Sequence, residues 1–436
     1  MKLKTLFSCL AASLVLAGCG GSDSDNDINR VVDPNGPIYL VKSTEWKGEE
    51  GTSLHFLSNT LDQNTEFNRD TALAIPEYTG IAIPEGANPD TAFYAGMYNE
   101  SVLRRYVITD QGELELANEL DFSGVTPQSG RNLLRATKIM SPTLGYALDF
   151  SGLQVIAFNP TDMTLIDTDP SKEGITSISL AAIEEENLPN RWSVFATTDG
   201  DRFVATIGFY EQDWTNPGVT KLVIVDSADH SLAVDTSSHT CSAVSGSAKD
   251  SAGNLYFASY DDVALDHFRD NIDFSPCMIR LLTGENEFDD SFMMDLTGLT
   301  DDDRLIMGAV TGTGDIAYNL IMNEAGQALI TDSTRVSALR VPVWEYHSFD
   351  LTAGVNATAT KVEGIVSIAE SPAVPAGTIS RILNGSFEHH EHGMITWMSH
   401  LEGGPISSIY NATNPTTWTL ISNTVPGQLE FVGRLK

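Results

Sequence analysis

Basic side chains are scarce in this sequence. Its 436 residues include 25 lysines and arginines against 59 aspartates and glutamates, which gives a formal net charge of −34. A chain this acidic repels phosphate backbones, so we predict no nucleic acid partner. The same charge argues against attachment to anionic lipid by electrostatics. The acidic residues are spread along the chain, as expected for a solvated surface.

The apolar segment at the start of the chain is too short to span a membrane. Residues 6–16 form an apolar run that follows two lysines and is interrupted by Ser8, Cys9 and Ser13. A run of this length after a positively charged start is typical of a secretory signal. We therefore predict that residues 1–18 are a signal peptide.

The predicted signal ends in Leu16-Ala17-Gly18-Cys19. This sequence resembles the lipobox of bacterial lipoproteins, which implies cleavage before Cys19 and lipidation of that cysteine. Several acyl chains make such an anchor effectively permanent. Gly20 stands where an aspartate would imply inner-membrane retention, so the resemblance implies an outer-membrane location, facing either the periplasm or the cell exterior. The alternative is an ordinary cleaved signal with a chance cysteine.

A polar segment follows the predicted anchor. Residues 20–29 (GGSDSDNDIN) contain one apolar side chain and cannot bury enough surface to fold. We predict a flexible tether over residues 19–36 and one folded domain over residues 37–436.

Few cysteines remain after the predicted cleavage and lipidation. Of four in the sequence, Cys241 and Cys277 are left, an even pair in an oxidising envelope compartment. We expect them to form a disulfide, with two separate buried thiols as the alternative. The absence of C-x-x-C spacing argues against a metal site made from this pair.

The folded region lacks sustained helical periodicity and contains many short runs rich in β-branched and aromatic residues. This pattern predicts an all-β fold. Apolar runs recur at intervals of 52 to 79 residues, which is the size of a four-stranded unit. The aromatic residues that mark the seven runs are Tyr39, Tyr94, Tyr146, Phe203, Tyr256, Tyr318 and Trp397.

This repeat predicts a single β-propeller with seven blades. An eighth, degenerate unit in the long interval between Tyr318 and Trp397 is the alternative. The last strand candidate, residues 429–435 (LEFVGRL), is expected to pair with the unit that begins near Ile38. That pairing would close the ring with strands from both ends of the chain.

Four segments of this region share a recognisable pattern: residues 111–116 (QGELEL), 120–124 (LDFSG), 145–149 (GYALD) and 155–163 (VIAFNPTDM). Together they resemble the surface lipoprotein β-propellers encoded near bacterial siderophore synthesis and TonB-dependent uptake systems. The resemblance covers residues 38–300 and implies capture of an iron–siderophore complex, or assistance to a TonB-dependent outer-membrane receptor, without catalysis. The alternative is a scaffold that docks on an envelope protein.

Enzyme motifs are missing from the sequence. It contains no G-x-S-x-G, no Walker loop and no G-x-G-x-x-G. We therefore predict a protein that is not an enzyme. A propeller hydrolase or oxidoreductase is the less favoured alternative, because scattered residues at a channel mouth leave no linear motif.

Because arginine is scarce, its clustering suggests where an anionic aromatic ligand could bind. Guanidinium groups and aromatic faces suit ferric siderophores of the catecholate class through charge and cation–π contact. Salt bridging to the abundant carboxylates is the alternative for each arginine. The candidates are Arg104, Arg105, Arg131, Arg135, Arg191 and Trp46.

A histidine-rich segment near the end of the chain is a candidate transition-metal site. Imidazole and carboxylate groups suit zinc, iron, nickel or copper. The spacing is not H-E-x-x-H, so it does not predict a zinc protease. A polar turn between blade strands is the alternative. The candidate ligands are His389, His390, His392 and His400.

Overall fold

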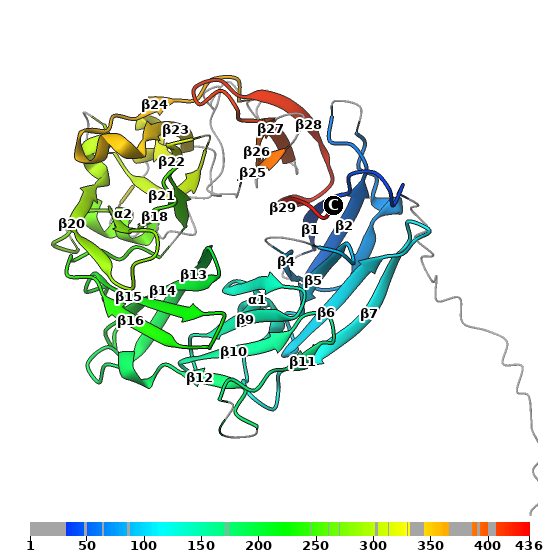
Figure 1. Cartoon of the computed structure of the whole chain (residues 1–436). Helices are drawn as coiled ribbons and strands as arrows, with labels where there is room; N and C mark the ends of the chain where they lie inside the picture. Colours follow the sequence, from blue (N-terminus) through cyan, green and yellow to red (C-terminus); the bar gives the residue numbers. More distant parts are fainter. Residues whose placement is uncertain are drawn as a thin grey trace, which may run out of the picture.

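The strands form seven antiparallel sheets that radiate from a common centre (Figure 1). The computed structural model describes residues 32–436 except 48–49, 63–64, 85–87, 170, 172–173, 245, 260, 270, 301–303, 313, 329, 332–343, 366–385, 390–392 and 400–406. Within these limits the fold is a seven-bladed β-propeller, as the sequence repeat predicts. The eight-bladed alternative is wrong: between Tyr318 and Trp397 the described strands complete blade 6 and begin blade 7.

Blades 2 to 7 are each built from consecutive strands, with the first strand nearest the centre and the last at the rim (Figure 1). Blade 2 contains β4 (Gly80–Ala82), β5 (Ala92–Gly96), β6 (Val102–Ile108) and β7 (Leu114–Asp121). Blade 3 contains β8 (Thr137–Ser141), β9 (Leu144–Asp149), β10 (Gln154–Asn159) and β11 (Thr164–Leu165), and β12 (Ser177–Ser179) also pairs with β10. Blade 4 contains β13 (Asn190–Asp199), β14 (Arg202–Tyr210), β15 (Val219–Asp226) and β16 (Leu232–Thr236).

The remaining consecutive blades follow the same plan. Blade 5 contains β17 (Ser247–Lys249), β18 (Leu255–Ala258), β19 (Cys277–Leu281) and β20 (Phe288–Asp295). Blade 6 contains β21 (Ile306–Thr311), β22 (Ile316–Met322), β23 (Trp344–Asp350) and β24 (Thr360–Lys361). Blade 7 contains β25 (Ser386–His389), β26 (Gly393–Ser399), β27 (Ser407–Asn411) and β28 (Thr419–Val425). Helical segments in the connections are η1 (Arg69–Thr71), α1 (Gly130–Leu134), η2 (Ala181–Ile183), α2 (Asp261–Phe268), η3 (Leu296–Leu299), α3 (Glu324–Gln327) and η5 (Leu351–Asn356).

Blade 1 joins the two ends of the chain. Its inner strand is β29 (Gln428–Arg434), followed outward by β1 (Tyr39–Lys47), β2 (Glu50–Ser58) and β3 (Leu73–Ile75). β29 pairs antiparallel with β1 from Tyr39↔Arg434 to Thr44↔Gln428. The predicted closure of the ring by residues 429–435 is confirmed. Closure leaves no long unpaired sheet edge at this junction.

The second strand of every blade carries one of the predicted aromatic residues, and these side chains are buried between blades. Tyr39 lies in one interblade core with Trp397 of blade 7, whereas its neighbour Leu40 lies in another with Phe93 of blade 2. Alternate residues of a strand point to opposite faces of the sheet, so each second strand contributes to two cores. Because both faces are covered, these strands are apolar throughout.

Successive strands of a blade run in opposite directions. The turns between second and third strands therefore lie on the same side of the propeller as the segments that link one blade to the next. We call this side the upper face and the opposite side the lower face. α1 lies on the upper face between β7 and β8, and α2 lies there between β18 and β19.

Residues 32 and 33 pack against blades 1 and 2. Val32 is buried in the core between blades 1 and 2, and its backbone N–H donates to the Gly112 carbonyl at 3.1 Å. Asp33 is held by Asn59, whose side-chain oxygen accepts from the Asp33 N–H at 2.7 Å. Within the described residues, one apolar side chain and one amide pair therefore hold residues 32 and 33 against the propeller. Within the described residues, no helix has the length and apolar character needed to cross a membrane.

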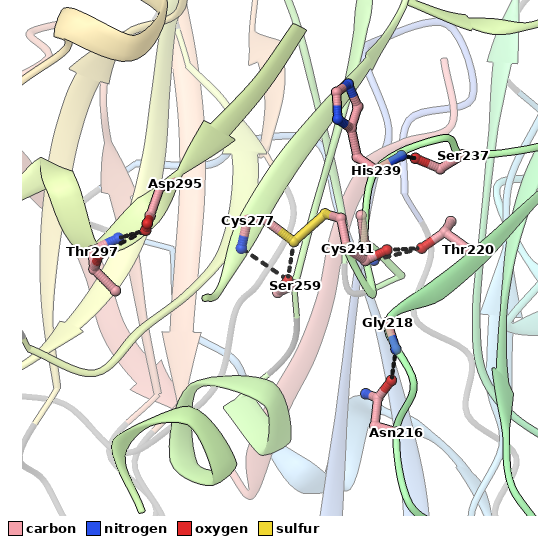
Figure 2. Close-up of a disulfide and its surroundings, with 11 residues drawn as sticks. Asn216, Gly218, Thr220, Ser237, His239, Cys241, Ser259, Cys277, Asp295 and Thr297 are labelled. Atoms are coloured by element: carbon pink, nitrogen blue, oxygen red, sulfur yellow. Dashed lines mark hydrogen bonds between the residues drawn. A yellow bond between two sulfur atoms is a disulfide. The ribbon is translucent and has the colours of Figure 1, made fainter. Parts of the chain in front are cut away.

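Cys241 and Cys277 form the disulfide that the cysteine count predicts, with their Cα atoms 5.8 Å apart (Figure 2). The bond links the segment between blades 4 and 5 to β19. The Cys277 N–H donates to the Ser259 hydroxyl at 3.1 Å, and the Thr220 hydroxyl donates to the Cys241 carbonyl. Both cysteines are buried. The bridge fastens the long β18–β19 connection, which contains α2, to the neighbouring blade.

Candidate functional site

Tyr78 lies on the upper face, in the segment that links β3 of blade 1 to β4 of blade 2. Ser53 of β2 fixes both of its neighbours: the Ser53 N–H donates to the Glu77 carbonyl at 3.2 Å, and the Thr79 N–H donates to the Ser53 hydroxyl at 2.9 Å. Ser53 and Thr79 are buried, whereas Tyr78 is half-buried. The ring is therefore held at a defined place over the junction of blades 1 and 2.

Two cations lie against the Tyr78 ring. The Lys42 ammonium is 4.5 Å from the ring centroid, and the Arg131 guanidinium carbon is 4.2 Å from it. Arg131 also lies 5.4 Å from the centroid of Tyr98. Cations at these distances are attracted by the electron-rich face of the ring. We call the following residues the Tyr78 cluster: Lys42, Trp46, Tyr78, Tyr98, Arg131, Arg135 and Glu430.

The short helix α1 holds Arg131 in place through its backbone. The Gly130 N–H donates to the Glu100 carbonyl at 2.7 Å, and the Arg131 N–H donates to the Met97 carbonyl at 2.9 Å. Gly96 and Gly130 allow this close approach, because a Cβ on Gly130 would lie 1.9 Å from the Val102 carbonyl oxygen. Arg131 is thus fixed on the β5–β6 turn.

Trp46 and Tyr98 flank the cluster as exposed rings. Trp46 is 47% exposed and Tyr98 is 49% exposed, and their centroids lie 5.1 and 6.3 Å from that of Tyr78. The Trp46 indole N–H donates to Gln428 Oε1 at 3.1 Å. The Glu77 carboxylate accepts from the Tyr98 N–H at 3.2 Å. Each exposed ring is therefore anchored by a hydrogen bond on its own residue.

Lys42 is a buried cation beneath this aromatic surface. It is 1% exposed, pairs with Glu430 of β29 and donates to the Thr44 hydroxyl at 3.1 Å. Burial lowers the pKa of Lys42, Glu430 opposes that shift, and the Arg131 charge adds to it. Burial and the Glu430 charge raise the pKa of Tyr78, so its phenol is neutral at physiological pH.

His55 lies on β2, directly opposite Lys42 of β1. Its ring stacks on Phe93 with centroids 5.5 Å apart, and its Nδ1 lies 3.3 Å from the Leu73 carbonyl oxygen. Burial, with a smaller contribution from the Lys42 charge, lowers the pKa of His55 to about 3. The imidazole is therefore neutral and adds no charge to the cluster.

The cluster gathers positive charge in a strongly acidic chain. Tyr78 is surrounded by Lys42, Arg131 and Arg135. The charges of Arg131 and Arg135 each act to lower the pKa of the Tyr78 phenol. The Glu430 carboxylate has the opposite effect and raises that pKa. Lys42 pairs with Glu430, and Arg131 and Arg135 add two further guanidinium groups beside Tyr78. A planar anionic ligand could stack on the exposed rings and meet this charge.

The structure brings together three of the six residues predicted to bind ligand. Trp46, Arg131 and Arg135 meet around Tyr78. Arg104 instead lies 3.3 Å from Glu119, and Arg105 pairs with Asp90. For these two arginines the alternative of salt bridging holds.

Arg191 also lies outside the cluster. Its guanidinium donates to the Ser151 carbonyl and to Glu184, each at 3.3 Å, and lies 5.6 Å from the Phe209 centroid. These partners belong to blades 3 and 4 and to the connection between them. Arg191 has the predicted cation–π contact, but it serves the packing of a different pair of blades.

The histidine-rich segment is not placed by the structure. The backbone of His389 ends β25 and pairs with Gly393, whereas His390, His392 and His400 lie outside the described residues. Cys19 also lies outside them. Among described residues, no group of three or more His, Cys, Asp or Glu side chains could hold a metal.

Sequence reasoning missed Lys42, Tyr78, Tyr98 and Glu430. One signal was present: Lys42 follows the apolar run Tyr39-Leu40-Val41 at a position that alternation assigns to an interblade core. A lysine in such a strand must find a partner, which marks it as unusual. The partner Glu430 is almost four hundred residues away, and nothing local in the sequence connects the two.

Comparisons with known proteins identify no family for this chain. No protein-family model and no curated protein matches it. Among solved structures, it is similar to a provisional 6-phosphogluconolactonase from Bacteroides fragilis, with 12% identity, a TM-score of 0.48, and coverage of 92% of this chain and 99% of that one. It is also similar to a periplasmic gluconolactonase from Pseudomonas aeruginosa, with 7% identity, a TM-score of 0.42, and coverage of 92% and 99%. Likenesses this distant carry no argument about the activity of this chain.

Proposed function

We propose that this chain is an envelope binding module that captures an anionic aromatic ligand, an iron–siderophore complex of the catecholate class, at the Tyr78 cluster. The observation that supports this most strongly is the placement of Lys42 and Arg131 against one tyrosine ring, at 4.5 and 4.2 Å, in a chain of net charge −34. A catecholate complex presents negative charge and aromatic faces together. Both features match the side chains of this cluster.

The exposed rings explain how such a ligand would be held. Trp46 and Tyr98 are each about half exposed and flank Tyr78, so they offer faces to a planar group approaching from the upper face. Trp and Tyr provide large contact area at little cost in side-chain entropy. The buried Lys42–Glu430 pair supports the site from below. The cluster binds in this proposal, and no side chain in it is assigned a catalytic step.

The proposal includes the location that the lipobox resemblance implies. A lipid on Cys19 would tether the propeller to the outer membrane through residues 20–31. A TonB-dependent receptor is then the expected recipient of the captured complex. Changing Cys19→Ser tests the anchor: the variant should leave the membrane fraction, and full retention would contradict lipid anchoring.

Equilibrium dialysis of the full chain against the iron(III) tris-catecholate complex tests the ligand class. We expect one bound equivalent with a micromolar or lower Kd, quenching of tryptophan fluorescence, and recovery of the complex unchanged. A neutral ferric trihydroxamate complex is the matched probe, because it carries iron without aromatic rings or comparable charge. Equal binding of both complexes, or binding of neither, would contradict the proposal.

A further inference from the structure

A row of polar side chains crosses the interior of blade 6. Asn319 on β22, His347 on β23 and Lys361 on β24 are successive cross-strand partners. Glu345 lies two residues before His347, so it shares the same face of the sheet. Asn319 is 0% exposed, Glu345 7% and His347 8%. The three are therefore buried on the face of blade 6 that packs toward blade 5.

Two of these residues have unsatisfied polar atoms. The amide nitrogen and oxygen of Asn319 and both ring nitrogens of His347 are buried without a hydrogen-bond partner in the described part of the protein. The large majority of buried side-chain polar atoms in folded proteins have a hydrogen-bond partner. Four such atoms on adjacent strands indicate that a further group belongs between them.

Glu345 shows which atoms that group would contact. Lys361 donates to Glu345 Oε1 at 2.7 Å, which fixes the carboxylate through its outer oxygen. The other oxygen, Oε2, lies 3.6 Å from His347 Nε2. That separation is too long for a hydrogen bond. Bonds from a tetrahedral zinc ion to nitrogen or oxygen are about 2.0–2.2 Å long, so two such ligand atoms lie roughly 3.3–3.6 Å apart. The distance between Glu345 Oε2 and His347 Nε2 matches this spacing.

We propose that blade 6 binds a divalent transition-metal ion of the zinc type through His347 Nε2 and Glu345 Oε2, with the Asn319 amide oxygen as the neighbouring third donor. Nitrogen and oxygen donors of these kinds suit such ions. Lys361 acts from outside the site by orienting the carboxylate, as outer-shell partners of metal ligands do.

The surroundings of the row fit a closed site. The residues on either side of Asn319 along the same face, Ala317 and Ile321, belong to an apolar core that includes Met278 of blade 5. Opposite Asn319, the register of β21 shifts between Met307 and Val310, which marks a β-bulge. Bulges are frequent next to functional sites, because they re-aim side chains. The site is thus separate from the Tyr78 cluster between blades 1 and 2.

The test measures zinc retained by the full chain, purified without a histidine tag. Because the histidine-rich segment could bind metal by itself, all variants carry His389→Ala, His390→Ala, His392→Ala and His400→Ala. In this background we expect one zinc equivalent, lost or bound at least tenfold more weakly after His347→Ala and after Glu345→Gln. His239→Ala is the matched control, since that histidine is half-buried far from blade 6 on the blade 4–5 connection and its Nε2 lies 3.1 Å from the Asp290 carbonyl oxygen. It should keep the full equivalent.

Two further measurements keep the proposal testable if His347→Ala folds poorly. Asn319→Leu keeps the branched shape and the number of side-chain heavy atoms, removes the amide, and should weaken zinc binding at least threefold. Cobalt(II) added to the parent should give the visible spectrum of a nitrogen- and oxygen-ligated ion, and Glu345→Gln should change it. Equal zinc retention by the parent, Glu345→Gln and Asn319→Leu would overturn the proposal. So would the absence of bound zinc in the parent at micromolar concentration.

Discussion

Lys42 on the first strand of the propeller and Glu430 on the last form an ion pair directly beneath Tyr78. The Lys42 side chain is 1% exposed and that of Glu430 is 16% exposed. The pair therefore joins the two ends of the chain where the ring closes. The Tyr78 cluster and the closure of the propeller therefore share Lys42 and Glu430.

Removing one partner of this pair should destabilise the fold strongly. Lys42→Met leaves the mostly buried Glu430 carboxylate without its lysine partner, and such a loss costs about 3–5 kcal/mol. The double variant Lys42→Met/Glu430→Leu should regain most of that stability, because no buried charge is left alone. Urea unfolding of the two variants measures the difference. Equal stability of the single and double variants would contradict the buried pairing.

Gly130→Ala should displace α1 from the β5–β6 turn. The added Cβ would lie 1.9 Å from the Val102 carbonyl oxygen, so the helix must shift and take Arg131 with it. We expect a loss of about 1–3 kcal/mol in unfolding free energy, as for overpacking. Ligand binding should weaken in the same variant. Gly124→Ala is the control, because no atom lies within 4 Å of its added Cβ, and it should be neutral.

Acidification should destabilise the protein partly through His55. Its pKa is lowered from 6.5 to about 3 in the folded state, so the unfolded state binds more protons between these values. Stability from this group is present above the unfolded pKa and is lost as pH falls toward 3. Between pH 6.5 and 4.5 the loss is about 2 kcal/mol.

The variant His55→Phe isolates this contribution. Phenylalanine keeps the stack on Phe93 and cannot titrate, so the variant should lose less stability than the parent over the same pH interval. Chemical unfolding at both pH values measures the difference. An identical pH dependence in the two proteins would show that His55 is not buried as a neutral imidazole.

The disulfide should stabilise the β18–β19 connection. Cys241 and Cys277 are 36 residues apart, and a loop of that length corresponds to about 3–4 kcal/mol in the chain-entropy model. Cys241→Ala/Cys277→Ala should lower the unfolding free energy by about that amount. Adding a reductant should lower the stability of the parent but leave the variant unchanged. A reductant effect of equal size on both proteins would point to another cause.

Blade number and ring closure could be predicted from the sequence because they depend on local repetition. Tyr39, Tyr146 and Tyr256 mark second strands because each such strand is covered on both faces and must be apolar. Residues 429–435 form a short apolar-rich run after the last complete blade, and the first blade would otherwise lack an inner strand. Local patterns of this kind survive in a single sequence.

The candidate site could be predicted only in part. Arg131 and Trp46 stood out by residue type, but the ring that joins them, Tyr78, lies in a connection with no strand pattern. Arg104 and Arg105 looked equivalent to Arg131 in the sequence. Because neighbouring side chains on β6 point to opposite faces of the sheet, Arg104 instead pairs with Glu119 and Arg105 with Asp90. Pairing between distant blades decides these roles, and a single sequence does not reveal it.

The Kd of the iron(III) tris-catecholate complex for Arg131→Gln, measured beside Arg104→Gln, tests the central claim most directly. Both changes remove one guanidinium, but Arg131 lies 4.2 Å from the Tyr78 centroid, whereas Arg104 pairs with Glu119. A cation–π and charge contact of this kind is worth about 1–2 kcal/mol, so Arg131→Gln should weaken binding about tenfold. Arg104→Gln should bind like the parent. Equal affinity in both variants would contradict a binding site at the Tyr78 cluster.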